Sequence, residues 1–495
     1  MYVPFRASLH KKGGTPLYYT YQDLLQVGDS DEERMEFARN VISSHMASQE
    51  YRTAKIADDY SRRKNRTIME YQKVLYTVTG AKVPDTISSN YKLCSNFFHR
   101  FVTQENQYLL GNGVQWEDAT KEKLGKNFDS VLQRVGKHAL IHGRSFGFFN
   151  KDHLEEFTLL EFAPLEDEET GALRAGVRFW QIDVNKPLRA TLYTEDGATD
   201  YIWYRRKGTS GDIEEEGQVL HAKQPYIVRV DVSQAEGERI VDGQNYPSFP
   251  IVPLWGNQYH QSELVGLREQ IDVYDLIKSG YANDVEDCAA IYWTISNAGG
   301  MDDVDLATFI NHIKTVKGAI VDQNGASAQP HTVSVPYESR EALLARLERD
   351  MYRDSMALDP YSIAGGAATA TQIRAAYEPL NSKTDEYEYC VLDFLHGIMR
   401  VAGIDDNPSF TRSTVVNTQE EIQVLVQTAD FLPRDYITTR ILSLFGDTDK
   451  AEEVIEQAKN EEMERFETAL EQQRQMQEMQ APEEAPVPAE GGGAE

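Results

Sequence analysis

The feature that most constrains this chain is a long stretch without proline, which begins after Pro253 and ends at Pro330. Its first part, residues 256–288, is rich in helix-forming side chains, and we expect a helix of about 28 residues over 261–289. At 1.5 Å per residue such a helix is about 42 Å long, whereas the average helix in a globular protein has about 12 residues. A helix of this length usually spans something. The aromatic segment AIYWTISNAGG follows it directly.

One face of the expected helix is apolar and its other faces are acidic. The apolar positions recur at steps of three, four and seven, which is the spacing of any amphipathic helix that packs against a core. They are Leu264, Leu267, Ile271, Tyr274, Tyr281 and Val285. The remaining faces carry only Arg268 and Lys278 as cations. Against these stand the carboxylates of Glu263, Glu269, Asp272, Asp275, Asp284, Glu286 and Asp287.

The length and composition indicate a folded, acidic protein of several domains. A chain of 495 residues exceeds one simple core, and we expect two to four domains. The net charge of −29 argues against a protein that grips nucleic acid over its whole surface, because such proteins carry basic patches. The sequence has no run of 18 apolar residues and no signal-peptide core. We therefore expect a soluble protein that is made in the cytosol and has no membrane contact.

Helical and sheet-forming parts alternate along the chain. The first third favours helices, among them SDEERMEFARN, where Ser30 suits an N-cap, and SSNYKLCSNFFHRFVTQENQYLL, which should stay helical up to Gly111. Residues 145–255 are aromatic and β-branched with turn signals, which predicts antiparallel hairpins. A second strong helix is expected at 338–357, and more helices after a glycine-rich segment. The low-complexity end of the chain predicts disorder.

The sequence contains no motif typical of an enzyme. There is no phosphate-binding P-loop and no GxSxG, HExxH or GxGxxG. His138 and His142 are four residues apart, but without a third ligand nearby two histidines on a helix face are favoured over a metal site. In MDDVDLATF, a helix cap at Asp302 or Asp303 is favoured over a magnesium site. We expect no cofactor, no metal and no catalytic activity.

The three cysteines and one basic cluster have simple interpretations. Cys94, Cys288 and Cys390 lie far apart and are expected to be free, buried thiols. SRRKNR, residues 61–66, is a basic cluster on an acidic chain. A surface patch is the favoured interpretation, and contact with DNA or with an acidic neighbour is the alternative.

In the order of its parts, the chain resembles the portal proteins of tailed bacteriophages over roughly residues 50–460. The most specific match is YPSFPIVPLWGNQYHQSELVGLREQIDVYD, a proline-bounded strand followed by the long helix. NYKLCSNFFHRFVTQENQYLLGNGVQW is similar to an early helix of that family, ALIHGRSFGFFNKD to the start of a strand at Gly143, and TATQIRAAYEPL to the segment after its tunnel loop. The chain departs from the family at DDYSRRKNR, which lacks a glycine turn, and at Thr371 and Gln372.

The resemblance implies a mainly helical α+β fold of the portal type that assembles as a ring. Its parts would be an N-terminal arm (1–19), an α+β wing (20–255), two stem helices (261–289 and 338–357), a clip (290–337), a tunnel loop (358–369), a connecting helix (370–400), a helical crown (401–470) and a disordered acidic tail (471–495). The long helix would then span the wall of a channel, and the aromatic segment after it would meet another protein.

The function that the resemblance implies is that of a ring of about twelve copies at one vertex of the capsid. The ring would belong to the virion and assemble in the host cytoplasm, and double-stranded DNA would pass through it during packaging and ejection. Its other partners would be the terminase large subunit, a head-completion or adaptor protein, and the major capsid and scaffolding proteins. The alternative is a helical scaffold or adaptor protein of capsid assembly without a DNA channel. That alternative leaves the aromatic sheet and the clip insertion unexplained.

The resemblance also implies three groups of site residues. Glu269, Asp272 and Lys278 would line the channel on the stem. Tyr361, Ser362, Gly365 and Gly366 would form the tunnel loop close to the duplex, although a flexible linker predicts the same composition. Tyr292, Trp293, Asp305 and Asn311 would form the docking surface of the clip. The alternative for the clip is that its aromatic strand pairs with GAIVD, residues 318–322, and serves ring closure alone.

Overall fold

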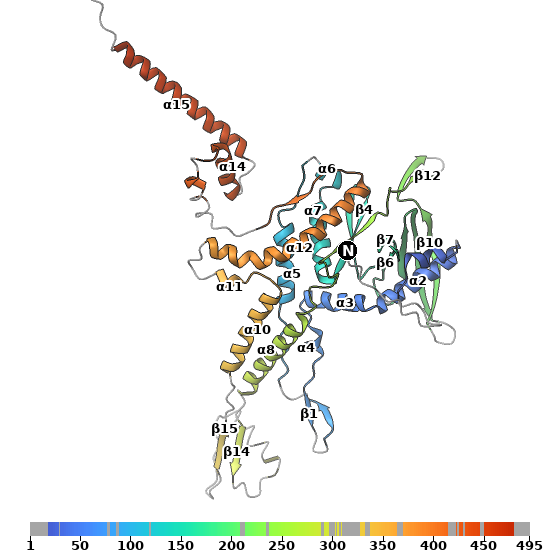
Figure 1. The fold of residues 1–495 in the computed structure, drawn as a ribbon. Coiled ribbons are helices and arrows are strands. Elements are labelled where there is room, and N and C mark those ends of the chain that lie inside the picture. Colours follow the sequence, from blue (N-terminus) through green and yellow to red (C-terminus); the bar gives the residue numbers. More distant parts are fainter. Residues whose placement is uncertain are drawn as a thin grey trace, which may run out of the picture. The chain divides into compact units, whose positions relative to one another are not determined.

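The computed structural model describes residues 18–479 with internal gaps. The gaps are 29, 77–79, 86–88, 118–119, 208–212, 234–236, 289–291, 297–301, 303, 306–307, 309–326, 332–336, 364–369, 414–421, 423–424, 429–430 and 446–449. Two compact units are present: the first comprises residues 1–360 and 376–414, and the second comprises 361–375 and 415–495. The fold is α+β, and Figure 1 shows its helices and strands.

The first unit contains most of the helices. They are α1 (Tyr21–Gln26), α2 (Asp31–Ala47), α3 (Gln49–Ser61), α4 (Arg66–Glu70), α5 (Phe97–Leu110), α6 (Thr120–Leu124), α7 (Phe128–His142), α8 (Arg268–Cys288), α10 (Tyr337–Asp354) and most of α12 (Ala370–Ala402). Among the described helices, none is long and apolar enough to cross a membrane.

The strands of the first unit pair in antiparallel fashion, as the sequence predicts for residues 145–255. The largest sheet has the order β10-β9-β8-β7-β6, formed by Ile213–Gln224, Gly197–Lys207, Leu188–Thr194, Leu173–Trp180 and Phe162–Glu166. A second sheet has the order β13-β4-β5, formed by Ile251–Trp255, Arg144–Asn150 and His153–Thr158. Two-stranded pairs join β11 (Ile227–Ser233) to β12 (Gly237–Gln244), β1 (Val74–Tyr76) to β2 (Lys82–Pro84), β14 (Tyr292–Ser296) to β15 (Ser327–His331), and β16 (Ser409–Phe410) to β3 (Val114–Gln115).

Three apolar clusters hold the first unit together. The largest lies among α5, α7 and α12 and takes in the near ends of α8 and α10. A second lies between α2 and the five-stranded sheet, and a third is an aromatic cluster around Phe146, Phe148, Phe157 and Phe162. The α8–α10 hairpin projects from the part of the unit that these clusters hold together (Figure 1). We call α8 and α10 the stem hairpin and the rest of the first unit, apart from the β14–β15 segment, the body.

Several helix ends follow directly from the sequence. The Ser30 side chain accepts the backbone N–H of Glu33 and caps α2, as predicted. Helix α7 ends at His142, where Gly143 adopts φ +91°, a left-handed conformation that suits glycine. The prediction for α5 was wrong at its start: residues 91–96 are not helical, and α5 begins at Phe97.

The long helix is shorter than the sequence indicates. Helix α8 has 21 residues and a length of about 31 Å, because residues 261–267 form turns rather than helix. The backbone N–H of Glu263 donates to the carbonyl of Leu140 at 3.0 Å, which ties this segment to the end of α7. Gly266 adopts φ +90°, a conformation that no helical residue has. The antiparallel partner α10 begins at Tyr337 and ends at Asp354.

The second unit contains α11 (Pro360–Ile363, of which Pro360 belongs to the first unit), the start of α12, α14 (Arg434–Phe445) and α15 (Ala451–Met479). An ion pair of 2.8 Å joins Lys459 on α15 to Asp435 on α14. Helix α15 continues nine residues into the segment 471–495 that was predicted to be disordered. Glu, Gln, Arg and Met are good helix formers, and the first proline after them is Pro482. Residues 480–495 lie outside the described part of the chain.

Candidate functional site

The stem hairpin is fixed to the body by aromatic packing at its near end. The ring of Tyr274 on α8 meets the ring of Phe97 at 5.0 Å and nearly at right angles. On α10, Tyr352 packs against Phe101 at 5.2 Å, and its hydroxyl accepts a hydrogen bond from Arg100. Since edge-to-face aromatic pairs stabilise beyond their buried area, these contacts set the direction in which the hairpin leaves the body.

The two stem helices are aligned by polar contacts along their length. Asp284 on α8 pairs with Arg340 on α10 at 2.5 Å near the far end of the hairpin. Near the body, the side chain of Gln270 donates to Asp354. These two contacts define the antiparallel register of α8 and α10. Asp284 is thus used inside the subunit rather than on an open acidic face.

A second face of α8 is covered by an extended segment, residues 91–95, which we call the strap. The backbone N–H groups of the strap donate to polar side chains on α8: Ser95 to Asp275 at 2.8 Å, Leu93 to Ser279 at 2.9 Å and Tyr91 to Asn283 at 2.6 Å. Four helical residues rise about 6 Å, and two extended residues about 6.6 Å. The spacing of every fourth residue on α8 therefore matches the spacing of every second residue in the strap. The three acceptor residues on α8 are buried.

Among the three acceptors, Asp275 most needs hydrogen-bond partners, because its carboxyl group is fully buried. Its second carboxylate oxygen accepts the Asn65 amide at 2.9 Å. Burial raises the pKa of Asp275, and the hydrogen bonds from Asn65 and Ser95 oppose that rise. Sequence reasoning assigned Asp275 to an outward acidic face, and the structure corrects this. The available signal was the four-residue spacing of Asp275, Ser279 and Asn283.

The three predicted channel-lining residues do not share one face of α8. Glu269 is exposed. The carboxylate of Asp272 faces α3 and α4, where it accepts hydrogen bonds from Tyr60 and, at 3.0 Å, from Thr67. Lys278 lies on another side of the helix, with its amine 5.7 Å from the centre of the Tyr274 ring. Of the three, only Glu269 is exposed, whereas Asp272 and Lys278 are half-buried.

The far end of the stem hairpin carries β14 and β15 (Figure 1). Tyr292 is opposite His331 and Trp293 is opposite Pro330 in this pair. The partner of β14 is thus Ser327–His331, which the sequence did not mark as a strand, and GAIVD lies outside the described residues.

The expected cap in the same segment is present. The Asp302 side chain accepts the N–H groups of Val304 and Asp305, both at 2.9 Å. Asp305 is exposed, and Asn311 lies outside the described part of the chain.

The segment expected as a tunnel loop contains the short helix α11. The first residue of this segment, Leu358, is held to the body. Its backbone and the side chain of Gln104 exchange two hydrogen bonds of 3.0 and 3.1 Å. Tyr361 belongs to α11 and is 77% exposed. Ser362 is also in α11, but its side chain is not described, and Gly365 and Gly366 lie outside the described residues.

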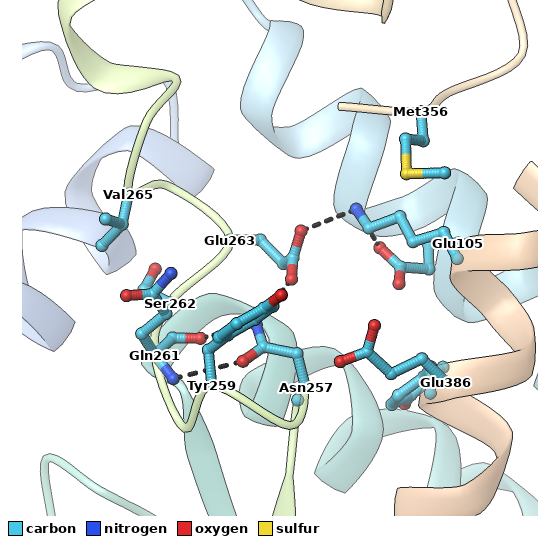
Figure 2. A pocket seen from close by; sticks show the side chains of 12 residues that line it. Glu105, Asn257, Tyr259, Gln261, Ser262, Glu263, Val265, Met356 and Glu386 are labelled. Carbon is cyan, nitrogen blue, oxygen red and sulfur yellow. Dashed lines mark hydrogen bonds and ion pairs between the residues drawn. The ribbon is translucent and has the colours of Figure 1, made fainter. Parts of the chain in front are cut away.

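A buried charge cluster lies where the stem begins, and it was not predicted. The Lys383 amine on α12 meets Glu105 on α5 at 2.7 Å and Glu263 at 2.6 Å (Figure 2). These residues line a cavity of about 200 Å³ together with Tyr259, Met356, Glu386 and others. Burial raises the pKa of Glu105 to about 7, in spite of the opposing charge of Lys383. The effect of the two carboxylates on Lys383 outweighs its burial, so that its pKa is raised.

The other titratable clusters have structural partners. His138 and His142 stack at 5.3 Å, with His138 paired to Glu156 and His142 lying 3.9 Å from Asp58. Within the described residues, no group of three or more His, Cys, Asp or Glu side chains is placed to hold a metal ion.

The basic cluster and the cysteines also have simple surroundings. In the basic cluster, Arg62 pairs with Asp58 at 2.9 Å and Arg66 with Asp59 at 2.7 Å. Cys94 and Cys390 are free and half-buried, whereas the sequence predicted burial. The side chain of Cys288 is not described.

Comparison with known proteins identifies this architecture. The chain belongs to the phage portal proteins, because residues 47–475 match the family described as "Phage portal protein, SPP1 Gp6-like". The portal protein of Bacillus phage SPP1 is 23% identical over 450 residues, which cover 83% of this chain and 82% of that protein. The portal protein of Clostridium phage phiCD119 is 25% identical over 210 residues, which cover 40% of this chain and 46% of the relative.

The solved structures to which the chain is similar include chains from the necks of gene transfer agent particles. A chain from the neck of an empty particle, computed with C6 symmetry, has a TM-score of 0.42 and 11% identity, covering 70% of this chain and 90% of that one. A chain from the neck of a native particle, computed with C12 symmetry, has a TM-score of 0.39 and 11% identity, covering 70% and 89%.

Proposed function

We propose that this chain is the subunit of a ring of about twelve copies that forms the channel for double-stranded DNA at one vertex of a phage capsid. The family match over residues 47–475 carries the proposal. The projecting stem hairpin supports it, because a pair of helices about 30 Å long can span the wall of a ring. The ring belongs to the virion and assembles in the host cytoplasm, where it contacts the major capsid and scaffolding proteins.

The negative charge of the stem suits a channel through which DNA slides rather than a surface that binds DNA. Helix α8 carries six carboxylates and two cations, and the whole chain has a net charge of −29. Asp272, Asp275 and Asp284 have partners in their own subunit, which leaves the other three carboxylates for the outer faces of the helix. Double-stranded DNA carries one negative charge per about 1.7 Å, and a basic bore would bind it and stall it. An acidic bore repels the duplex from every side and lets it slide. We place Glu269, Asp272 and Lys278 on the part of the stem near the channel. Glu269 lies at the edge where neighbouring stems meet, whereas Asp272 and Lys278 also have contacts within their own subunit.

The far end of the stem and the segment after it supply the remaining roles. Tyr292, Trp293, Asp305 and Asn311 form the surface on which the terminase large subunit docks during packaging and a head-completion or adaptor protein afterwards. The exposure of Asp305 supports this assignment. Tyr361, Ser362, Gly365 and Gly366 form the loop nearest to the duplex, and the exposure of Tyr361 supports that role. These roles need no cofactor, and they include no enzymatic activity.

Electron microscopy of the purified full-length chain tests the ring. Negative-stain images should show rings with a central hole, and native mass spectrometry should give about twelve subunits. Because the summed charge of such a ring is large, we expect assembly to improve as salt rises toward 0.15 M, where the screening length is about 8 Å. A chain that stays monomeric at every salt and protein concentration would contradict the proposal.

A further inference from the structure

One face of α8 is left open by the rest of its own subunit. α10 covers one side of this helix and the strap covers another. The open face carries Val273 and Leu276, which are 45% and 43% exposed, together with exposed Glu269 and half-exposed Gly280. The spacing of four, three and four residues places these side chains on a single stripe. We call this stripe the α8 ridge.

Helix α10 presents a small and basic face on the side turned away from α8. Ala342, Ala345, Arg346, Arg349 and Arg353 recur at steps of three and four and are all exposed. The side chains of Arg346 and Arg353 are 75% and 77% exposed. Both lie within 4.0 Å of Asp350 on the same helix, and exposed contacts of this kind are weak and easily exchanged. We call this stripe the α10 face.

The α8 ridge and the α10 face are matched in height. The contacts Asp284–Arg340 and Gln270–Asp354 set the antiparallel register. By this register Glu269 lies level with Ser355, about half a helical turn from Arg353. Leu276 lies level with the turn between Ala345 and Arg349, and Gly280 with the turn between Ala342 and Ala345. A rotation about an axis along the stem preserves height. A neighbouring copy in a ring therefore presents its α10 face to the α8 ridge at these same levels.

We propose that the α8 ridge of one copy packs against the α10 face of the next copy. Leu276 and Gly280 lie beside the small side chains Ala342 and Ala345, and Val273 lies against the aliphatic part of Arg349. Glu269 pairs with Arg353, and Arg349 is the next cation along the same face. The occupant is a second copy of this chain because the two faces are complementary in charge as well as in size, on a chain whose net charge of −29 otherwise opposes self-association. The proposal rests on the proposed ring and assigns the residues of its stem contact.

Charge reversal tests the pairing. Glu269→Arg should lower the fraction of chains in rings by about tenfold at a fixed concentration, and Arg349→Glu with Arg353→Glu should do the same, because each places like charges opposite one another. The combination of all three changes should restore the fraction to within about twofold of wild type. Glu122→Arg, the same change at an exposed position on α6, is the matched control and should leave rings unchanged.

Cysteine cross-linking provides a second measurement that does not depend on charge. In a chain whose native cysteines are replaced by alanine, Leu276→Cys with Ala345→Cys should give covalent multimers on mild oxidation. Leu276→Cys with Leu343→Cys, which lies off the α10 face, should not. If wild type forms rings but the reversed charges do not rescue each other and Leu276→Cys with Ala345→Cys gives no multimers, the stem contact is wrong and the proposed function stands. If wild type forms no ring, both proposals fail.

Discussion

The body and the stem hairpin use their charged side chains in different ways. In the body, Arg144 is buried and meets Glu50 and Glu166 at 2.8 and 2.5 Å, and Lys383 is buried between Glu105 and Glu263. On the outer side of the hairpin, Arg346 and Arg353 are exposed. A buried charge is stable only when it is paired, and these two cations of the body are paired within one chain. The hairpin arginines have only exposed contacts with Asp350, which a second molecule can replace.

The comparison also separates the two sides of α8. Towards the body and the strap, polar side chains of α8 are buried and hydrogen-bonded. Ile271 joins the main apolar cluster, together with Leu264 and Leu267 from the turns just before the helix. Away from them, Val273, Leu276 and Val285 are exposed although they are apolar. The near end of the helix is therefore part of the fold, and its open face is available for assembly. Each prediction below tests this division between folding and assembly.

The largest expected effect is the loss of the buried cation. Lys383→Met leaves buried Glu105 and half-buried Glu263 without a counter-charge. Breaking a buried ion pair in this way costs about 3–5 kcal/mol of unfolding free energy. Denaturant unfolding at pH 8 measures the loss. The control is Lys223→Met, which breaks the more exposed pair with Asp196 and should cost under about 1 kcal/mol. Equal effects at the two lysines would show that the Lys383 cluster does not support the body.

The second prediction compares two apolar residues on α8. Ile271 is 2% exposed and Leu276 is 43% exposed. Ile271→Ala should lower the free energy of unfolding by about 2–5 kcal/mol, because it leaves a cavity in the core. Leu276→Ala should change it by no more than about 0.5 kcal/mol, while reducing the fraction of chains in rings. Thermal unfolding of dilute monomer and native mass spectrometry separate the two effects. A large loss of monomer stability in Leu276→Ala would place that residue in the fold.

The third prediction concerns pH. The pKa of Glu105 rises from 4.5 when unfolded to about 7 in the fold, so the folded chain holds the proton more tightly. This group therefore lowers stability as the pH rises from about 4.5 to about 7, by on the order of 3 kcal/mol. His45 acts in the opposite direction, because burial lowers its pKa from 6.5 to about 4, and its contribution rises with pH between those values.

The contribution of Glu105 is isolated by comparing wild type with Glu105→Gln at each pH. The difference in free energy of unfolding should grow in favour of the variant from pH 4.5 to 7 and then level off. Glu122→Gln, at an exposed position, is the control and should give a flat difference. A flat difference for Glu105→Gln as well would mean that the carboxyl of Glu105 is ionised throughout this range in the fold.

Local signals in the sequence account for much of this fold. The cap at Ser30, the left-handed Gly143, the β-branched hairpins and the return helix α10 all depend on residues close together in the chain. The start of α8 was missed because the hydrogen bond from Glu263 to Leu140 joins segments far apart in sequence. The Glu105–Lys383–Glu263 cluster and the strap were missed for the same reason. Periodicity shows that a helix has a polar face, but it does not show whether water or another segment covers that face.

The smallest expected effect is at the strap, where the stem and the body share hydrogen bonds. Ser279→Ala removes the acceptor for the Leu93 N–H and should cost about 1–2 kcal/mol of unfolding free energy. The more sensitive measurement is amide hydrogen exchange of residues 89–96, which should become about tenfold faster because the strap opens more often.

Ser279→Thr keeps the hydroxyl and should restore slow exchange, which separates the hydrogen bond from any change in packing. The rings should form normally in both variants, because the strap lies on a different side of α8 from the ridge proposed for assembly. If exchange is unchanged in Ser279→Ala, other contacts hold the strap. The hydrogen bonds that follow from the matched spacing of α8 and the strap would then add nothing to its stability. If rings are lost while the strap stays protected, Ser279 belongs to the assembly surface, and the division of α8 into a folding side and an assembly side is wrong.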